Sequence, residues 1–220
     1  MSRLARVVLP EVPHHVTQRG VRSMNIFSCD EDKVFYLKLF QSAAIEFGLE
    51  ILSYCLMDNH VHFLVVPKNE TSLRNGIGSV HRQYSRMVNL RENTRGFLFQ
   101  GRFFSCPLDS QYLSSALSYI ELNPVRAGIC DEASEYNWSS SRFYLGLDSE
   151  NLLIKNRNWF GSIDNWKTLL QEPPKNLDLL RMHFRTGRPL GDAQFLLKAE
   201  KITGRKLIPQ KPGRKPKGEN

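Results

Sequence analysis

The sequence predicts an α+β domain in which helices pack on one face of an antiparallel sheet. Its polar and apolar residues fall into the order strand, helix, hairpin, helix, strand, helix, which is typical of this class. The 220 residues are 41% hydrophobic and 24% charged, an ordinary globular composition for one medium domain with a small extension. No stretch approaches the ~18 consecutive apolar residues of a membrane span, and the start of the chain lacks the apolar core of a signal peptide. We therefore expect a cytoplasmic protein that makes no contact with a membrane.

The first part of the chain predicts a strand and then a helix. Pro10 and Pro13 forbid a helix at the start, and an alternating extended stretch follows at residues 15–18. Asp30 opens an acidic first turn, after which apolar residues recur at helical spacing until Gly48.

A hairpin and three further elements complete the predicted domain. Residues 50–56 and 60–66 read as two antiparallel strands, and the polar pair Asp58 and Asn59 forms the turn between them. A helix, a strand and a second helix are then expected at about 72–90, 97–104 and 109–123.

The rest of the chain predicts a helical extension and a basic tail. We place the core domain at residues 1–147, a helical extension that is a candidate for DNA binding at 148–203, and a basic tail at 204–220. Pro, Gly and Lys dominate the tail, so we expect it to be disordered without a partner.

The distribution of charge points to a polyanionic partner. The chain carries a net charge of +8, and its last 20 residues hold seven Lys or Arg and a single Glu. A nearly neutral body with a basic tail favours nucleic acid over a tail that serves only solubility. Charge alone does not separate DNA from RNA.

The sharpest local signal is a His-Val-His strand. On a strand His60 and His62 project from the same face, and two neutral imidazoles begin a divalent metal site. An oxygen ligand has to come from elsewhere, and a hard ion such as Mg²⁺ or Mn²⁺ would complete its shell with phosphate oxygens and water. The alternative is a pair of half-buried histidines that only form hydrogen bonds. Histidine-triad hydrolases are disfavoured because their third histidine would stand at Leu64, and barrel hydrolases because a full barrel needs ~250 residues.

A second signal lies on the last predicted core helix. Tyr119 and Asn123 are four residues apart and share one helical face, and Pro124 stops the helix behind them. Beside a metal-polarised phosphate a phenol becomes a competent nucleophile, and Asn123 could supply the missing oxygen ligand. The alternative is a packing aromatic followed by an amide that caps the helix end.

Together these segments resemble the HUH single-tyrosine transposases, in particular the REP-associated tyrosine transposases of bacteria. The resemblance rests on His60-Val61-His62, on Tyr119 to Gly128, on Pro13 to Gly20 and on Phe99 to Phe103, and it covers residues 5–146.

The resemblance implies a ferredoxin-like core and a specific chemistry. His60 and His62 would be metal ligands, Asn123 a third ligand, and Tyr119 the nucleophile that forms a 5′-phosphotyrosine. The substrate would be single-stranded DNA with palindromic hairpin repeats, cleaved and rejoined in the presence of Mg²⁺ or Mn²⁺, without a small-molecule cofactor.

Further residues are candidates for binding DNA. Arg82 and Arg86 could track phosphates from the long helix or simply form a solvated face, and Arg102 joins charge to neighbouring aromatics. The tail around Arg214 and Lys215 loosely resembles a minor-groove AT-hook. Gln18 and Arg19 could also line the DNA path. A role as general base is possible for His14 or His15, although strand packing or a phosphate hydrogen bond fits them better.

Three classes of function compete. The first is a transposase, acting as a monomer or a homodimer. The second is a catalytically silent regulator that binds nucleic acid with the same fold. The third is a metal-dependent nuclease without a covalent intermediate. The presence of all four site residues favours the transposase, because a silent protein would have no physical need of them.

Overall fold

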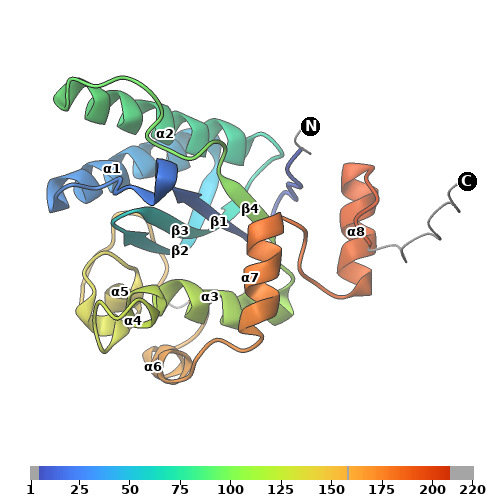
Figure 1. Cartoon of the computed structure of the whole chain (residues 1–220). Coiled ribbons are helices and arrows are strands. Elements are labelled where there is room, and N and C mark those ends of the chain that lie inside the picture. Colours follow the sequence, from blue (N-terminus) through green and yellow to red (C-terminus); the bar gives the residue numbers. More distant parts are fainter. Residues whose placement is uncertain (1–4, 158, 209–220) are drawn as a thin grey trace, which may run out of the picture.

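The structure is a computed structural model that describes residues 5–157 and 159–208. Its core follows the order strand, helix, two strands, helix, strand (Figure 1). These elements are β1 (His14–Arg19), α1 (Asp30–Phe47), β2 (Leu49–Met57), β3 (His60–Pro67), α2 (Ser72–Arg91) and β4 (Phe104–Pro107). The helices that follow are α3 (Leu113–Glu121), α4 (Asn123–Arg126), α5 (Ser141–Tyr144), α6 (Ile163–Gln171), α7 (Leu177–Thr186) and α8 (Ala193–Thr203). Short 3₁₀ turns lie at η1 (Val21–Ser23), η2 (Ser110–Tyr112) and η3 (Ala133–Glu135).

The four strands form one antiparallel sheet in the order β2-β3-β1-β4. The hairpin β2–β3 is joined by the predicted turn, and β1 lies between β3 and β4. This confirms the predicted α+β fold with a ferredoxin-like antiparallel sheet.

Helices cover both faces of the sheet, whereas the sequence had predicted one covered face. On the first face α1 packs through Phe40, whose ring stacks on that of Phe63 with centroids 4.1 Å apart. On the second face α3 lies against β2 and β3, and α7 lies against β4 and β1 (Figure 1). The reason is that β3 is apolar on both sides, since Phe63 and Leu64 point in opposite directions and both are fully buried.

Two predicted boundaries are wrong. The last strand begins at Phe104, and residues 97–103 hold only an isolated bridge between Phe99 and Gly20. Gly101 has a φ of 68°, a left-handed conformation that breaks an extended strand. The helix predicted over 109–123 is divided, and Asn123 opens α4 with Pro124 in its first turn instead of closing α3.

The predicted helices of the extension are present as α6, α7 and α8. Trp166 of α6 is fully buried and stacks on Tyr144 at 3.9 Å. Ala199 of α8 packs with Val7 and Leu9 near the start of the described chain. In the part of the chain that the structure describes, every helix is too short or too polar to cross a membrane.

Candidate active site

The floor of the candidate site is set by the register of three strands. His60 is the cross-strand partner of Arg19, and His62 is the partner of Thr17. Thr17 also pairs with Phe104 on its other side. Because cross-strand partners share a face of a sheet, these five side chains project from the face that α3 and α7 cover. The imidazole rings of His60 and His62 lie 4.9 Å apart, as their spacing on one strand predicts.

Hydrogen bonds hold both imidazoles by the same ring nitrogen. Nδ1 of His60 is 2.5 Å from Oδ1 of Asn59, an oxygen that can only accept. Nδ1 of His62 is 2.8 Å from Nε2 of His15. When Nδ1 carries the proton in both rings, each Nε2 keeps a lone pair that can bind a metal. A neighbour that fixes the tautomer, as Asn59 does for His60, is typical of histidines that bind metals.

Burial keeps these histidines neutral. Desolvation, helped by the charge of Arg19, lowers the pKa of His60 to about 4. Desolvation also lowers the pKa of His62 well below its usual value. Neutral imidazole is the form that binds metals, so the donor atoms are in the right protonation state at neutral pH.

Tyr119 lies above the histidines. Its half-buried ring meets the ring of His62 edge-on with centroids 5.7 Å apart. The guanidinium carbon of Arg126 lies 4.4 Å from the centre of the Tyr119 ring, and Nη2 donates to the Tyr119 carbonyl at 2.6 Å. Asn123 donates from Nδ2 to the same carbonyl at 3.3 Å, which leaves its Oδ1 available as a ligand. Both predicted residues of this segment therefore lie at one place, although the helix breaks between α3 and α4.

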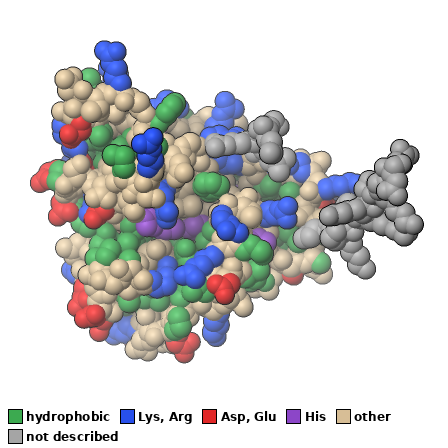
Figure 2. Space-filling model, in the orientation of Figure 1, with side chains coloured by type: hydrophobic (Ala, Val, Ile, Leu, Met, Phe, Trp, Pro, Cys, Tyr) green, Lys and Arg blue, Asp and Glu red, His purple; other side chains and the backbone are tan. Residues whose placement is uncertain are grey.

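The four residues predicted to bind the metal or to attack the phosphate line one pocket of about 650 Å³. It holds Tyr119, His60, His62 and Asn123 together with the predicted DNA-binding residues Gln18, Arg19 and Arg102. None of its lining residues is an Asp or a Glu. Figure 2 shows histidine side chains in the middle of this face of the molecule, with Lys and Arg side chains on more than one side of them.

The other predicted DNA-binding residues lie elsewhere. Arg82 and Arg86 are exposed and line a separate pocket of about 710 Å³ between α2 and the segment 93–101. Arg214 and Lys215 lie outside the described residues. Gln18 is buried, and its Nε2 donates to the carbonyl of Gly101 at 3.2 Å, so its amide also holds the loop at the pocket edge.

The two histidines that open β1 have different surroundings. His14 is fully buried, accepts from the Leu9 backbone N–H through Nε2 and bonds the Val12 carbonyl through Nδ1. Both of its nitrogens are thus used in strand packing. His15 points the other way, into the site, where it contacts His62.

Sequence reasoning gave no role to several residues of the site. Arg126 stands in the Tyr119 segment but was given no role. Arg181, Phe184 and Arg185 of α7 also line the pocket. The amphipathic pattern of α7 showed that it packs on something, but no local signal indicates which surface it covers.

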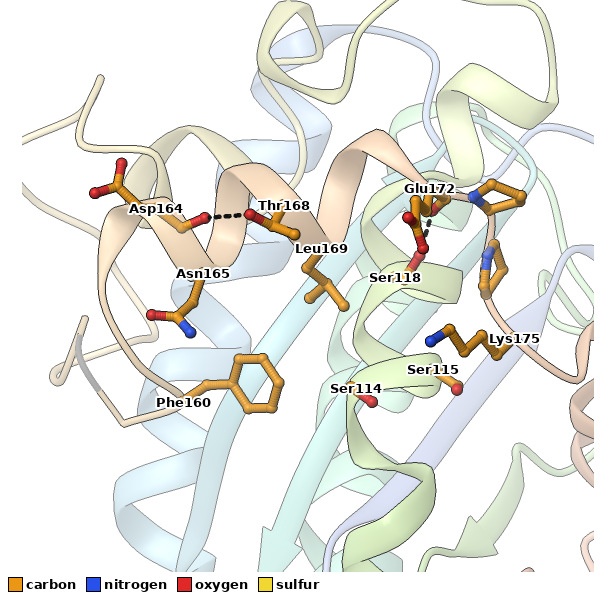
Figure 3. Close-up of a pocket in the computed structure, with 12 residues that line it drawn as sticks. Ser114, Ser115, Ser118, Phe160, Asp164, Asn165, Thr168, Leu169, Glu172 and Lys175 are labelled. Carbon is orange, nitrogen blue, oxygen red and sulfur yellow. Dashed lines mark hydrogen bonds between the residues drawn. The ribbon is translucent and has the colours of Figure 1, made fainter.

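A third pocket lies between α3 and α6 (Figure 3). Two of its hydroxyl groups are engaged locally: Ser118 donates to the Glu172 carbonyl at 3.4 Å, and Thr168 donates to the Asp164 carbonyl at 3.0 Å. None of the predicted site residues lines it.

Comparisons with known proteins give the family. The family model described as transposase IS200-like matches residues 13–123, a range that contains His60, His62, Tyr119 and Asn123. A REP-associated tyrosine transposase of Haemophilus influenzae is 24% identical over 166 residues, which cover 67% of this chain and 92% of the relative.

The fold has solved counterparts. A REP-associated tyrosine transposase bound to a REP hairpin is similar with a TM-score of 0.56 at 15% identity, over 74% of this chain and 93% of that one. A transposase from Deinococcus radiodurans gives a TM-score of 0.37 at 18% identity, over 55% and 96% of the two chains, which is too low to support an argument. The first likeness supports the fold, and the family match covers half of the chain. The chain therefore belongs to the family of IS200-like transposases, and it is a transposase of the HUH type, an enzyme that acts on DNA.

Proposed function

We propose that this transposase cleaves and rejoins single-stranded DNA beside hairpin repeats, with Tyr119 as the nucleophile and a divalent metal as the cofactor. The observation that carries the proposal is the contact of Tyr119 with His62 in a pocket that also holds His60 and Asn123. A phenol, two imidazoles and an amide oxygen form a set suited to phosphoryl transfer.

The residues of the pocket fit a hard divalent ion. Nε2 of His60, Nε2 of His62 and Oδ1 of Asn123 are the donors left open by the hydrogen bonds described above. Among the described residues no group of three or more His, Cys, Asp or Glu side chains could hold a metal, so the amide oxygen is needed. Mg²⁺ or Mn²⁺ bound there would neutralise charge on the scissile phosphate.

Tyr119 carries the covalent step. Its Oη bonds to phosphorus while the bond from phosphorus to the 3′ oxygen breaks, so the phenol loses a proton and the 3′ hydroxyl gains one. The product is a 5′-phosphotyrosine and a free 3′ end. A 3′ hydroxyl that attacks the phosphotyrosine reverses the step and joins DNA without an external source of energy, because one phosphodiester replaces another.

The pocket walls support DNA as the substrate. Arg19 and Arg102 line the pocket beside Gln18, and positive side chains attract a phosphate backbone. The solved relative bound to a REP hairpin supports a hairpin-bearing strand as the partner of this chain. All four site residues belong to one chain and one pocket, which supports a site assembled within a single protomer.

A covalent adduct tests the proposal. Purified protein is mixed with end-labelled hairpin single strands from the repeats that flank its gene, with and without Mg²⁺ or Mn²⁺, and run on a denaturing gel. We expect a metal-dependent protein–DNA adduct that is lost in Tyr119→Phe and kept in Tyr112→Phe, a matched variant outside the pocket. His62→Ala is expected to lose both the adduct and the binding of Mn²⁺ followed by electron paramagnetic resonance.

Other outcomes would contradict the proposal. Cleavage without an adduct that persists in Tyr119→Phe would indicate a nuclease that uses water. Tight binding without cleavage of any strand would indicate a silent regulator.

A further inference from the structure

Helix α7 forms one wall of the active site although it lies outside the range that the family model matches. The ring of Phe184 stacks on His15 with centroids 3.7 Å apart and meets Tyr119 edge-on at 5.2 Å. Phe184 and Leu180 are buried, so the apolar side of α7 is fixed on the sheet and on α3.

The chain after α7 anchors the helix further. Leu190 donates its backbone N–H to the Pro107 carbonyl at 2.9 Å, and its carbonyl accepts from the N–H of Asp109 at 2.8 Å. These bonds continue the edge of β4 and hold the end of α7 in place. Side chains on the pocket side of α7 therefore have a fixed position relative to the histidines.

Two arginines flank Phe184 on this helix. Arg181, Phe184 and Arg185 follow the i, i+3, i+4 spacing of one helical face, and all three line the pocket of Tyr119. Arg185 is exposed and has no hydrogen bond or ion pair within the part of the chain described. Arg181 is 56% exposed and pairs only with the exposed Asp178 at 3.7 Å, a contact worth little in water. Neither arginine is needed for packing.

We propose that Arg181 and Arg185 bind phosphates of the single strand that leads to the scissile bond. The inference rests on the proposed function of the same pocket. Two further features favour a single strand over duplex DNA. Phe104 is 48% exposed in this pocket and offers a ring on which an unpaired base can stack. The arginines also lie on the wall beside Tyr119, where the strand has to be unpaired for attack.

The test measures binding separately from cleavage. All proteins carry Tyr119→Phe, so that no adduct forms, and fluorescence anisotropy follows a labelled hairpin with a single-stranded tail at several salt concentrations. Arg181→Gln with Arg185→Gln removes two phosphate contacts. The slope of log K against log salt should then become shallower by about 1.4, since each contact on a single strand contributes about 0.7. If both proteins bind equally well at about 1 M salt, this change in slope makes the binding of the Gln pair about 25-fold weaker at about 0.1 M salt.

Three controls test whether the change in slope comes from contacts of the two arginines with the single strand. Lys38→Gln with Lys155→Gln removes the same charge from exposed positions outside the pocket and should leave the slope unchanged. Arg181→Lys with Arg185→Lys keeps the charge and should keep most of the slope. The same hairpin without its tail should show little difference between the proteins. Circular dichroism checks that the variants are folded.

The outcomes separate this inference from the proposed function. If the Gln pair keeps the parental slope and affinity while the wild type forms the adduct, the α7 inference is wrong and the proposed function stands. If the slope falls as expected but the wild type forms no adduct, the α7 inference stands and the proposed function fails. An equal loss for the tailless hairpin would show that the arginines bind duplex DNA instead.

Discussion

Glu121 should make the stability of the protein depend on pH in a direction opposite to that of the buried histidines. It lies two residues after Tyr119, is fully buried, and accepts hydrogen bonds from Ser53 at 2.7 Å and from Ser140. Burial raises the pKa of Glu121 to about 7, and the hydroxyl donors oppose this shift. The test variant is Glu121→Gln, which keeps the shape of the side chain and removes the charge.

The size of the pH effect on stability follows from the pKa shift of Glu121. The pKa in the folded state is about 7, above the usual value of 4.5, so the folded protein holds this proton more tightly. The corresponding stability is fully present below pH 4.5 and is lost as the pH rises through 7. The pKa shift corresponds to a loss of about 3 kcal/mol in the free energy of unfolding, and most of this loss occurs between pH 5 and 8. Burial lowers the pKa of His14 to about 4 and that of His15 to about 3. These two histidines therefore make the folded protein less stable as the pH falls below about 6.5, which is opposite to the effect of Glu121.

The contribution of Glu121 is isolated by the difference in the free energy of unfolding between wild type and Glu121→Gln. Urea unfolding of wild type and Glu121→Gln at pH 5 to 8 gives this difference, from which the histidines cancel. We expect the variant to gain about 2 to 3 kcal/mol relative to wild type over that range. Glu50→Gln, at an exposed position of β2, should give a flat difference. A flat result for Glu121→Gln, or a difference that falls with pH, would mean that the serine donors outweigh burial and keep the carboxylate ionised.

Two further predictions concern the frame of the site. In Gly20→Ala the new carbon would lie 2.1 Å from the Met24 carbonyl oxygen, so thermal unfolding should show a loss of about 3 kcal/mol. Gly78→Ala, at a half-buried position inside α2 where the new carbon meets only the Arg82 guanidinium at 3.4 Å, should instead gain about 1 kcal/mol. Although burial opposes it, the hydrogen bonds from Arg91 and Ser28 hold the pKa of the buried Asp32 below its usual range. Arg91→Gln should therefore cost about 3 kcal/mol in urea unfolding at pH 7, and a loss below about 1 kcal/mol would show that Asp32 does not depend on this partner.

The parts of the site that were predictable from the sequence obey local rules. The alternation of a strand places His60 and His62 on one face, and their ring separation of 4.9 Å agrees with it. A spacing of four residues brought Tyr119 and Asn123 together even though the helix breaks between them, because α4 continues from the end of α3. The start of β4 was misplaced because a strand pattern rich in aromatics runs through Gly101, whose left-handed φ is set by the loop and not by hydropathy.

What could not be predicted depends on contacts between distant parts of the chain. His15 bonds His62 across 47 residues, and Phe184 stacks on His15 from a helix in the extension. Amphipathic spacing shows that a helix has a buried side but not which surface receives it. The covering of the second sheet face by α3 and α7 was missed for the same reason.

The pocket has neutral histidines on its floor and arginines on its walls, and its chemistry depends on this arrangement. Burial keeps His60 and His62 neutral, which leaves lone pairs for a metal, while the arginines at the pocket edge are exposed to water. With no carboxylate among the lining residues, negative charge beside the proposed divalent ion would have to come from the substrate. A DNA phosphate brings that charge, and the same phosphate backbone is what the arginines attract. For the proposed reaction, DNA and metal would thus each strengthen the binding of the other, because both complete the same group of donors around Tyr119.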